Sequence, residues 1–196
     1  MMRATVCFGL LVLAAGCAAA PAPAQAIFCV AEIRSFSNPD AGARGDFGPN
    51  VRFADVQIGS KAVGYGAAGG RSDEITIADG VLHLARPNGA GSHRQRIAAA
   101  SGEGAYMLQL INVEGWRAPS ILPVIPSLDA LGAEISDQAR AAGCSGPAKL
   151  AYRIEGRVRR AEWSLDTLPQ RGDFVSEGQD VVIVGLFATV EQGRHF

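Results

Sequence analysis

The sequence predicts an α+β fold that is mostly β, with a mixed or antiparallel sheet and one dominant helix. Most of the apolar runs are short, and in several of them aliphatic residues alternate with polar ones, as in half-buried strands. One stretch, 127–142, instead repeats its apolar residues at helical spacing. The 196 residues include 24 glycines and 10 prolines, which mark turns between the strands. We therefore expect short strands joined by tight turns.

The chain divides into a signal peptide over 1–26 and a single domain over 27–196. Arg3 supplies the positive end, and the apolar core that follows is too short to span a bilayer. Ala24-Gln-Ala26 resembles a cleavage site and predicts export to the periplasm or the medium. An alternative stays open, because Leu13-Ala-Ala-Gly-Cys17 approximates a lipobox. Lipidation of Cys17 would hold the protein at the outer membrane, and only in that case do we expect membrane contact.

The first third of the domain predicts one strand and two glycine-rich segments. Residues 27–33 predict the first strand, and 37–50 are rich in turn-forming residues and predict a loop. The segment 59–70 is glycine-rich but lacks the spacing of nucleotide-binding loops. We interpret it as a close-packed turn or a strand bend.

A hairpin follows, and its signals are the clearest in the chain. Ile75 and Ile77 alternate with polar residues and predict the inward face of a strand. Asp79-Gly80 is a two-residue turn of the type that requires positive φ, and Leu82 and Leu84 continue the inward face.

The second half predicts strands around a single helix. Ser127 can cap a helix that ends near Ala142, with Leu128, Leu131, Ile135 and Ala142 along one buried stripe. The strands are expected at 106–113, 150–154, 157–165 and 181–190, with a turn at Glu155-Gly156.

Cysteine usage and charge restrict the function classes. Cys29 and Cys144 remain in the domain after either kind of processing, and in an exported protein a disulfide between them is the simplest prediction, two separate thiols being the alternative. The net charge is −1, with acids and bases interleaved, so we expect no nucleic-acid partner.

Two charged residues stand out because each lies within an apolar strand. Glu74 precedes Ile75, and Arg153 lies between Tyr152 and Ile154. A charge in such a strand costs free energy unless a partner compensates it. Since the two charges are opposite, we expect Glu74 and Arg153 to converge on one cleft.

The order of these segments resembles the acetolactate decarboxylase family, over about Val56 to Phe187. The similar features are the Glu74 strand with its Asp-Gly turn, the later helix, the segment Arg153-Ile-Glu-Gly156, and an apolar strand that ends in Val184-Gly-Leu-Phe187. Members of this family are metal-dependent lyases that convert α-acetolactate, a 2-hydroxy-3-oxo acid, to acetoin and carbon dioxide. The resemblance implies the same fold and reaction for this chain.

The resemblance also implies a catalytic site with a zinc ion. In the family, three histidines hold the metal, and Glu74 and Arg153 match the positions of a glutamate near the reacting carbon and an arginine that pairs with the carboxylate. The metal ligands follow the last apolar strand, where this sequence has only His195 before it stops. We therefore expect a truncated or C-terminally short member that binds zinc poorly.

Two other functions remain open at this stage. The chain could be a non-catalytic periplasmic module that binds a small acid or has a structural role on the same fold. It could also be a metal-dependent hydrolase, because a fold does not fix a reaction. His83 and His93 are expected on a half-exposed strand and in a loop.

Overall fold

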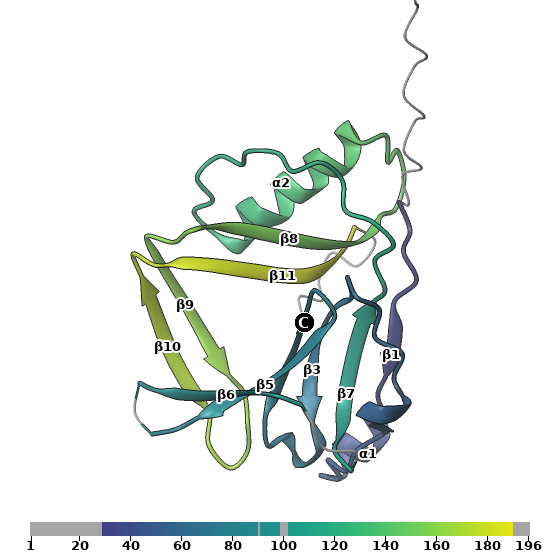
Figure 1. Ribbon diagram of the computed structural model, residues 1–196, viewed down its shortest axis with the longest axis vertical. Helices are drawn as coiled ribbons and strands as arrows, with labels where there is room; N and C mark the ends of the chain where they lie inside the picture. Colours follow the sequence, from purple (N-terminus) through teal and green to yellow (C-terminus); the bar gives the residue numbers. More distant parts are fainter. Residues whose placement is uncertain (1–28, 90, 99–101, 190–196) are drawn as a thin grey trace, which may run out of the picture.

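A computed structural model describes residues 29–89, 91–98 and 102–189 and confirms an α+β fold that is mostly β (Figure 1). The main sheet has the strand order β1-β7-β3-β4-β5-β6, with β2 also paired to β7, and every pairing is antiparallel. Its strands are β1 (Arg34–Phe36), β2 (Val51–Arg52), β3 (Val63–Ala68), β4 (Glu74–Ala78), β5 (Val81–Pro87), β6 (His93–Ile97) and β7 (Gly104–Ile111). The proposed signal peptide, Cys17 and His195 lie outside the described residues.

The predicted β4–β5 hairpin is confirmed. Asp79 and Gly80 have φ angles of 48° and 77°, and Ala78 pairs with Val81 across the turn. Side chains at alternate positions form a core on one face of the main sheet, packed against partly buried residues of the N-terminal segment. The largest fully buried side chains are those of Ile75, Ile77, Leu84, Leu108, Leu110 and Val63.

The glycine-rich segment forms β3, which lies very close to β7. A Cβ atom at Gly66 would lie 2.0 Å from the carbonyl oxygen of Met107, and one at Gly64 would lie 2.5 Å from that of Gln109. The glycines therefore allow the predicted close packing, but residues 63–68 form a strand rather than a turn.

The predicted first strand is mostly replaced by irregular chain. In the segment before β1, Val30 forms an isolated bridge to Lys149, and Cys29 is joined to Cys144 with their Cα atoms 5.5 Å apart. The disulfide prediction is confirmed. The predicted loop 37–50 contains a short helix, α1 (Pro39–Ala43), and the 3₁₀ turns η1 (Phe53–Asp55) and η2 (Gly69–Arg71) follow β2 and β3.

The four C-terminal strands form two antiparallel pairs. The pairs follow one another as a long two-stranded ribbon with a bend between them. β8 (Lys149–Arg157) pairs with β11 (Asp180–Ala188), and β9 (Arg160–Leu165) pairs with β10 (Gly172–Glu177). Val158 N–H donates to Gln179 O at 3.0 Å, which keeps the two halves continuous across the bend. In Figure 1, β8 and β11 cross above the main sheet, and β9 and β10 turn down toward it. We call residues 149–188 the ribbon and its β9–β10 part, residues 160–177, the strap.

The predicted turn at Glu155-Gly156 is wrong. Both residues lie inside β8, opposite Val182 and Val181 of β11. The antiparallel ladder with β11 satisfies their backbone groups, so the strand continues and the chain bends two residues later.

The predicted helix is α2 (Leu128–Ala141), and it lies on the face of β8 and β11 that points away from the main sheet (Figure 1). The Ser127 hydroxyl accepts a hydrogen bond from Ala130 N–H, as expected of an N-cap. Leu131 and Ala142 are buried and Ile135 is half-buried, but Leu128 is 79% exposed. The prediction for Leu128 is wrong, because side chains of the first helical turn point back beyond the helix N-terminus.

Within the described part of the chain, no helix has both the length and the apolar character that crossing a membrane requires.

Candidate functional site between the main sheet and the ribbon

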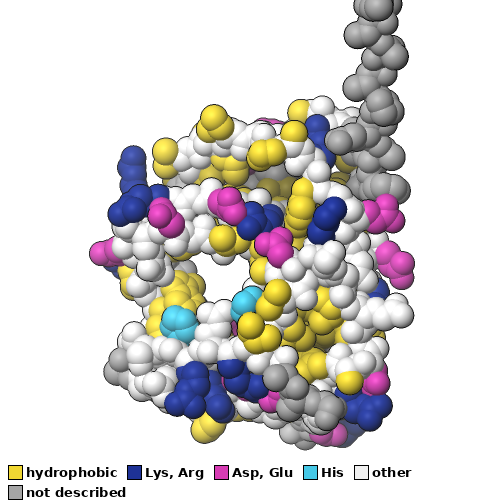
Figure 2. Space-filling model, viewed as in Figure 1, with side chains coloured by type: hydrophobic (Ala, Val, Ile, Leu, Met, Phe, Trp, Pro, Cys, Tyr) yellow, Lys and Arg dark blue, Asp and Glu magenta, His cyan; other side chains and the backbone are white. Residues whose placement is uncertain are grey.

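An opening passes through the molecule between the ribbon and the main sheet (Figure 2). In the view of Figures 1 and 2, β8 and β11 form its upper border, the strap its left border, and strands of the main sheet the rest. The side chains of histidine, arginine and acidic residues gather around it. This opening is the candidate site.

The sheet contributes a polar face to the opening. Because Ile75, Ile77, Leu82 and Leu84 point into the core, the side chains between them point to the opposite face. The strand register places Thr76 opposite both Tyr65 of β3 and His83 of β5. Glu74 is the first residue of the strand that contains Thr76. The hydroxyl of Tyr65 donates to Gln109 Oε1 at 2.9 Å, and burial raises the pKa of this phenol. This face offers hydrogen-bonding groups rather than an apolar surface.

Glu74 lies half-buried where the strap meets the sheet. Its Oε1 accepts a hydrogen bond from Asp166 N–H at 2.5 Å. Burial raises the pKa of Glu74, and the nearby Asp166 carboxylate adds to this rise. The Asp166 N–H and the guanidinium groups of Arg71 and Arg171 oppose the rise without cancelling it. A carboxyl group with a raised pKa keeps its proton to a higher pH than an ordinary carboxyl group, which suits it to proton transfer.

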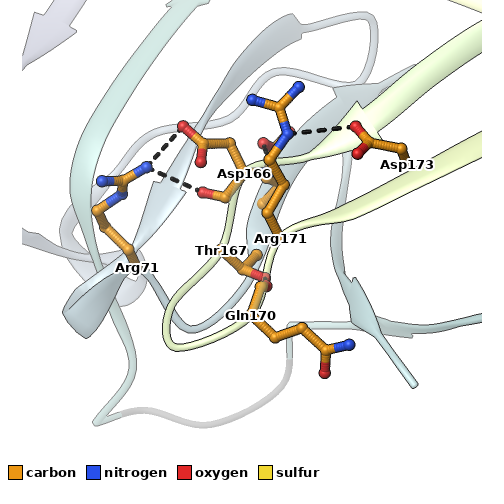
Figure 3. Close-up of polar contacts among 7 residues, drawn as sticks. Arg71, Asp166, Thr167, Gln170, Arg171 and Asp173 are labelled. Atoms are coloured by element: carbon orange, nitrogen blue, oxygen red, sulfur yellow. Dashed lines mark hydrogen bonds and ion pairs between the residues drawn. The ribbon is translucent and has the colours of Figure 1, made fainter. Parts of the chain in front are cut away.

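Arg71 in turn binds Asp166, the residue whose N–H contacts Glu74, and neither Arg71 nor Asp166 was singled out by the sequence (Figure 3). Arg71 Nη2 donates to Asp166 Oδ2 at 2.6 Å and to Asp166 O at 3.2 Å. Leu168 N–H donates to Arg71 O at 2.8 Å. Arg71 and Asp166 are 95 positions apart, so no local pattern links them.

Arg153 lies on the opposite wall, in β8. Its Nε donates to Asp79 Oδ2 at 3.1 Å, and its Nη1 lies 2.5 Å from Glu155 Oε1. Since Asp79 belongs to the β4–β5 turn, the Arg153 side chain spans from the ribbon to the main sheet. The Arg153 side chain remains 27% exposed.

Glu74 and Arg153 each join the ribbon to the main sheet but do not pair. Glu74 is the first residue of β4, whereas the partner of Arg153, Asp79, follows the last one. Five strand residues separate the two ends by about 16 Å. The expectation that each charge offsets the desolvation of the other is therefore wrong, because each has its own partner on the opposite wall.

The histidines do not form a metal site in the described part of the chain. His83 is half-buried in β5 on the polar face, whereas the ring of His93 packs edge-on against Trp163 and Phe174, with centroids 5.1 and 5.5 Å away. His93 lies in β6 rather than in a loop, contrary to expectation. Among the described residues, no three side chains of His, Cys, Asp or Glu are grouped so that they could hold a metal ion. These residues therefore do not fit the zinc that the resemblance implies.

Two hollows lie elsewhere on the protein. A groove of about 440 Å³ lies at the bend of the ribbon, between Glu155–Arg157 and Asp180–Val182. A smaller one, of about 240 Å³, is lined by Phe53, Arg96 and Glu103 among others. Neither of these two hollows is lined by Glu74 or Arg153.

The chain matches no protein-family model, and no curated protein is significantly similar to it.

Proposed function

We propose that this chain is an acetolactate decarboxylase-like lyase domain that takes a small 2-hydroxy-3-oxo acid into the opening between the main sheet and the ribbon. One observation supports this above the others. Glu74 and Arg153, which the resemblance singles out, each join the ribbon to the main sheet, and both are only half-buried. The contacts of the two residues lie at opposite ends of β4, about 16 Å apart along the strand, so a small acid bound at Arg153 must move along the polar face of the sheet to reach Glu74.

The two residues suit different parts of such a substrate. The guanidinium of Arg153 presents a planar fork of donors that matches a carboxylate, although Asp79 and Glu155 already occupy part of it. When the carbon–carbon bond to the carboxylate breaks, its electron pair forms an enediolate, which then needs a proton to give acetoin. Glu74 has a raised pKa and is the group that we propose as the source of this proton.

The zinc ion of the resemblance has no ligand set among the described residues. A divalent metal would stabilise the enediolate as a Lewis acid when bound. Our proposal for Glu74 and Arg153 is therefore limited to proton transfer and carboxylate binding.

A turnover assay tests this proposal. We expect the purified chain to bind little zinc and to release no acetoin from α-acetolactate. An extended chain that supplies a His-x-His pair and a further histidine after the last strand should bind zinc and release acetoin. In that extended chain, Glu74→Gln and Arg153→Ala should abolish turnover while zinc stays near one equivalent. Full activity in both variants would refute the assigned roles.

A second candidate is a non-catalytic module of the periplasm that binds a small acid or has a structural role. The observation in its favour is that Glu74 and Arg153 each connect the ribbon to the main sheet. Binding of a small acid without acetoin release by the extended chain would favour this second function.

We also propose that the protein is exported, with cleavage after Ala26 or, alternatively, lipidation at Cys17. The support is the Cys29–Cys144 disulfide, which persists in oxidising compartments. Mass spectrometry of the mature protein distinguishes an unmodified N-terminal Ile27 from a lipidated Cys17.

A further inference from the structure

The strap closes one side of the opening by reaching from the ribbon to the main sheet. Contacts hold it there at its tip, along its inner face, and at Gly172, where an added Cβ would lie 2.8 Å from Pro87 Cγ of β5. The rest of its described ion pairs are internal, such as Arg160 with Glu162 and Glu177, and Arg171 with Asp173. The strap is therefore a hairpin with its own internal ion pairs, and the tip and the aromatic face are the contacts at which its docking can be tested.

The first contact is the tip, residues 166–171. Three groups on the main sheet or η2 hold it: the Glu74 carboxylate binds Asp166 N–H, the Arg71 guanidinium binds Asp166, and Arg71 O binds Leu168 N–H. The buried hydroxyl of Thr167 donates instead to Gln170 O within the tip, at 2.5 Å. The tip thus keeps its own shape and meets the sheet through polar contacts that water can replace (Figure 3).

The second contact is aromatic. Trp163 and Phe174 stack on the inner face of the strap with ring centroids 4.4 Å apart, and His93 of β6 packs against both. The indole N–H of Trp163 donates to Ser176 Oγ inside the strap at 3.0 Å. The two aromatic rings would therefore stay together if the strap left His93.

The bend gives the strap a place to pivot. The β8–β11 pairing ends before the bend, and the β9–β10 pairing begins after it. At the bend itself, two backbone hydrogen bonds connect the two strands of the ribbon. These run from Val158 N–H to Gln179 O and from Gly178 N–H to Arg159 O, at 3.0 and 3.3 Å. Gly178 has a φ of 59°, which glycine adopts without strain. A glycine at a break between two regular ladders is suited to a change of backbone angle.

From this geometry we propose that the strap is a latch that undocks from the main sheet as an intact hairpin, pivoting at residues 158–159 and 178–179, and that the Arg71–Asp166 pair holds it closed. Undocking opens one side of the site and removes the Asp166 N–H from Glu74. The inference rests on the proposed function only for what enters the opening. Docking itself can be measured without any ligand.

Residue-resolved hydrogen exchange of the full chain tests the latch. The amides of Asp166 and Leu168 report docking, because their acceptors lie on Glu74 and Arg71. The amides paired between β9 and β10 report the integrity of the hairpin. If the strap undocks as a unit, the two tip amides exchange at least about tenfold faster than the β9–β10 amides. Equal protection of both groups would overturn the proposal.

Two variants and a matched control complete the test. Arg71→Ala and Asp166→Asn should each speed exchange at the Leu168 amide by about tenfold, because each removes a charged hydrogen bond. The β4–β5 amides should not change. Arg160→Ala removes a strap arginine that pairs with Glu162 and Glu177 and has no contact at the tip, so it should leave the exchange rates of the tip amides and of the β4–β5 amides unchanged. If Arg71→Ala speeds the β4–β5 amides as well, the protein has unfolded globally and Asp166→Asn decides the question. No effect of Asp166→Asn on the tip amides would contradict the latch.

A fluorescence measurement gives a second readout. In a Trp116→Phe background, Trp163 is the only tryptophan, and its ring contacts His93. Arg71→Ala should make Trp163 more accessible to acrylamide, whereas Arg160→Ala should not. Equal quenching in the two variants would show that Arg71 does not hold the strap closed.

Discussion

Glu74 shows how a strand tolerates a carboxylate without a direct cationic partner. It is half-buried, and its closest partner is the N–H of Asp166. That single donor does not compensate fully for the lost hydration, so the pKa of Glu74 is raised, with burial as the main cause. A raised pKa is useful in a carboxyl group that transfers a proton, which is the role we propose for Glu74.

The raised pKa of Glu74 predicts a specific pH dependence of stability. A carboxyl whose pKa is higher in the folded state than the ordinary value of 4.5 binds protons more tightly when folded. Its contribution to stability is fully present below about pH 4.5 and is lost as the pH rises through the folded-state pKa. Urea unfolding of the wild type and of Glu74→Gln, from about pH 4 to about pH 7, measures this contribution. It is the difference between the free energies of unfolding of the two proteins at each pH. The wild type should lose stability relative to the variant as pH rises, and a constant difference would contradict the raised pKa.

The sequence identifies Glu74 and Arg153 as costly charges but not their partners. Asp79 lies 74 positions from Arg153, and Asp166 lies 92 positions from Glu74. Asp79 lies in the β4–β5 turn and Asp166 directly follows β9, and an aspartate is ordinary at the end of a strand. Pairing the two conspicuous charges with each other was therefore reasonable but wrong, because neither partner differs locally from a turn residue.

At the scale of single elements, close packing and turn chemistry decide the outcome. β3 can pack against β7 only because Gly64 and Gly66 have no side chains. The Asp79-Gly80 turn combines two positive φ values that fit a two-residue hairpin. Both features were predictable, since glycine content and turn type are local properties of the sequence.

Two glycine substitutions test this element-level account in opposite directions. Gly66→Ala places a Cβ 2.0 Å from Met107 O, so we expect a loss of about 3 kcal/mol or failure to fold. Gly132 lies in α2 with no atom within 4 Å of an added Cβ. Gly132→Ala should therefore stabilise the protein by about 0.5–1 kcal/mol. Chemical denaturation measures both, and equal effects would contradict the assigned packing.

The ribbon shows where local patterns stop being informative. The pair Glu155-Gly156 has turn-forming character, but it lies inside β8 because β11 pairs with it from 25 or more positions away. The real bend, near Val158 and Gly178, depends on how the two ladders meet. The opening under the ribbon, and therefore the candidate site, could not be predicted from the sequence, because it arises from this bend and from the docking of the strap.

At the scale of the whole molecule, the disulfide ties the N-terminal segment to the end of α2. It closes a sequence separation of 115 residues, and Cys29 also accepts a hydrogen bond from Lys149 N–H through its carbonyl. A link of this length restricts the unfolded chain strongly.

We expect the double variant Cys29→Ser/Cys144→Ser to lose about 2–5 kcal/mol of unfolding free energy. Urea titration of the variant and of the oxidised and reduced wild type measures this loss. The reduced wild type should match the variant. If the oxidised wild type is no more stable than the variant, the disulfide does not support the fold.

Binding of a non-reacting analogue tests most directly whether the opening is a site for a small hydroxy acid. A 2,3-dihydroxy acid keeps the carboxylate and both oxygens of the substrate but lacks the ketone needed for decarboxylation. NMR titration of the purified chain should show shift changes at Glu74, Thr76 and His83, from which a dissociation constant is obtained. Arg153→Gln should weaken binding by about tenfold or more, because it removes a charge-assisted contact, whereas Arg160→Ala should leave it unchanged. Saturable shifts confined to other surfaces, or equal affinity in Arg153→Gln and the wild type, would contradict the proposed site.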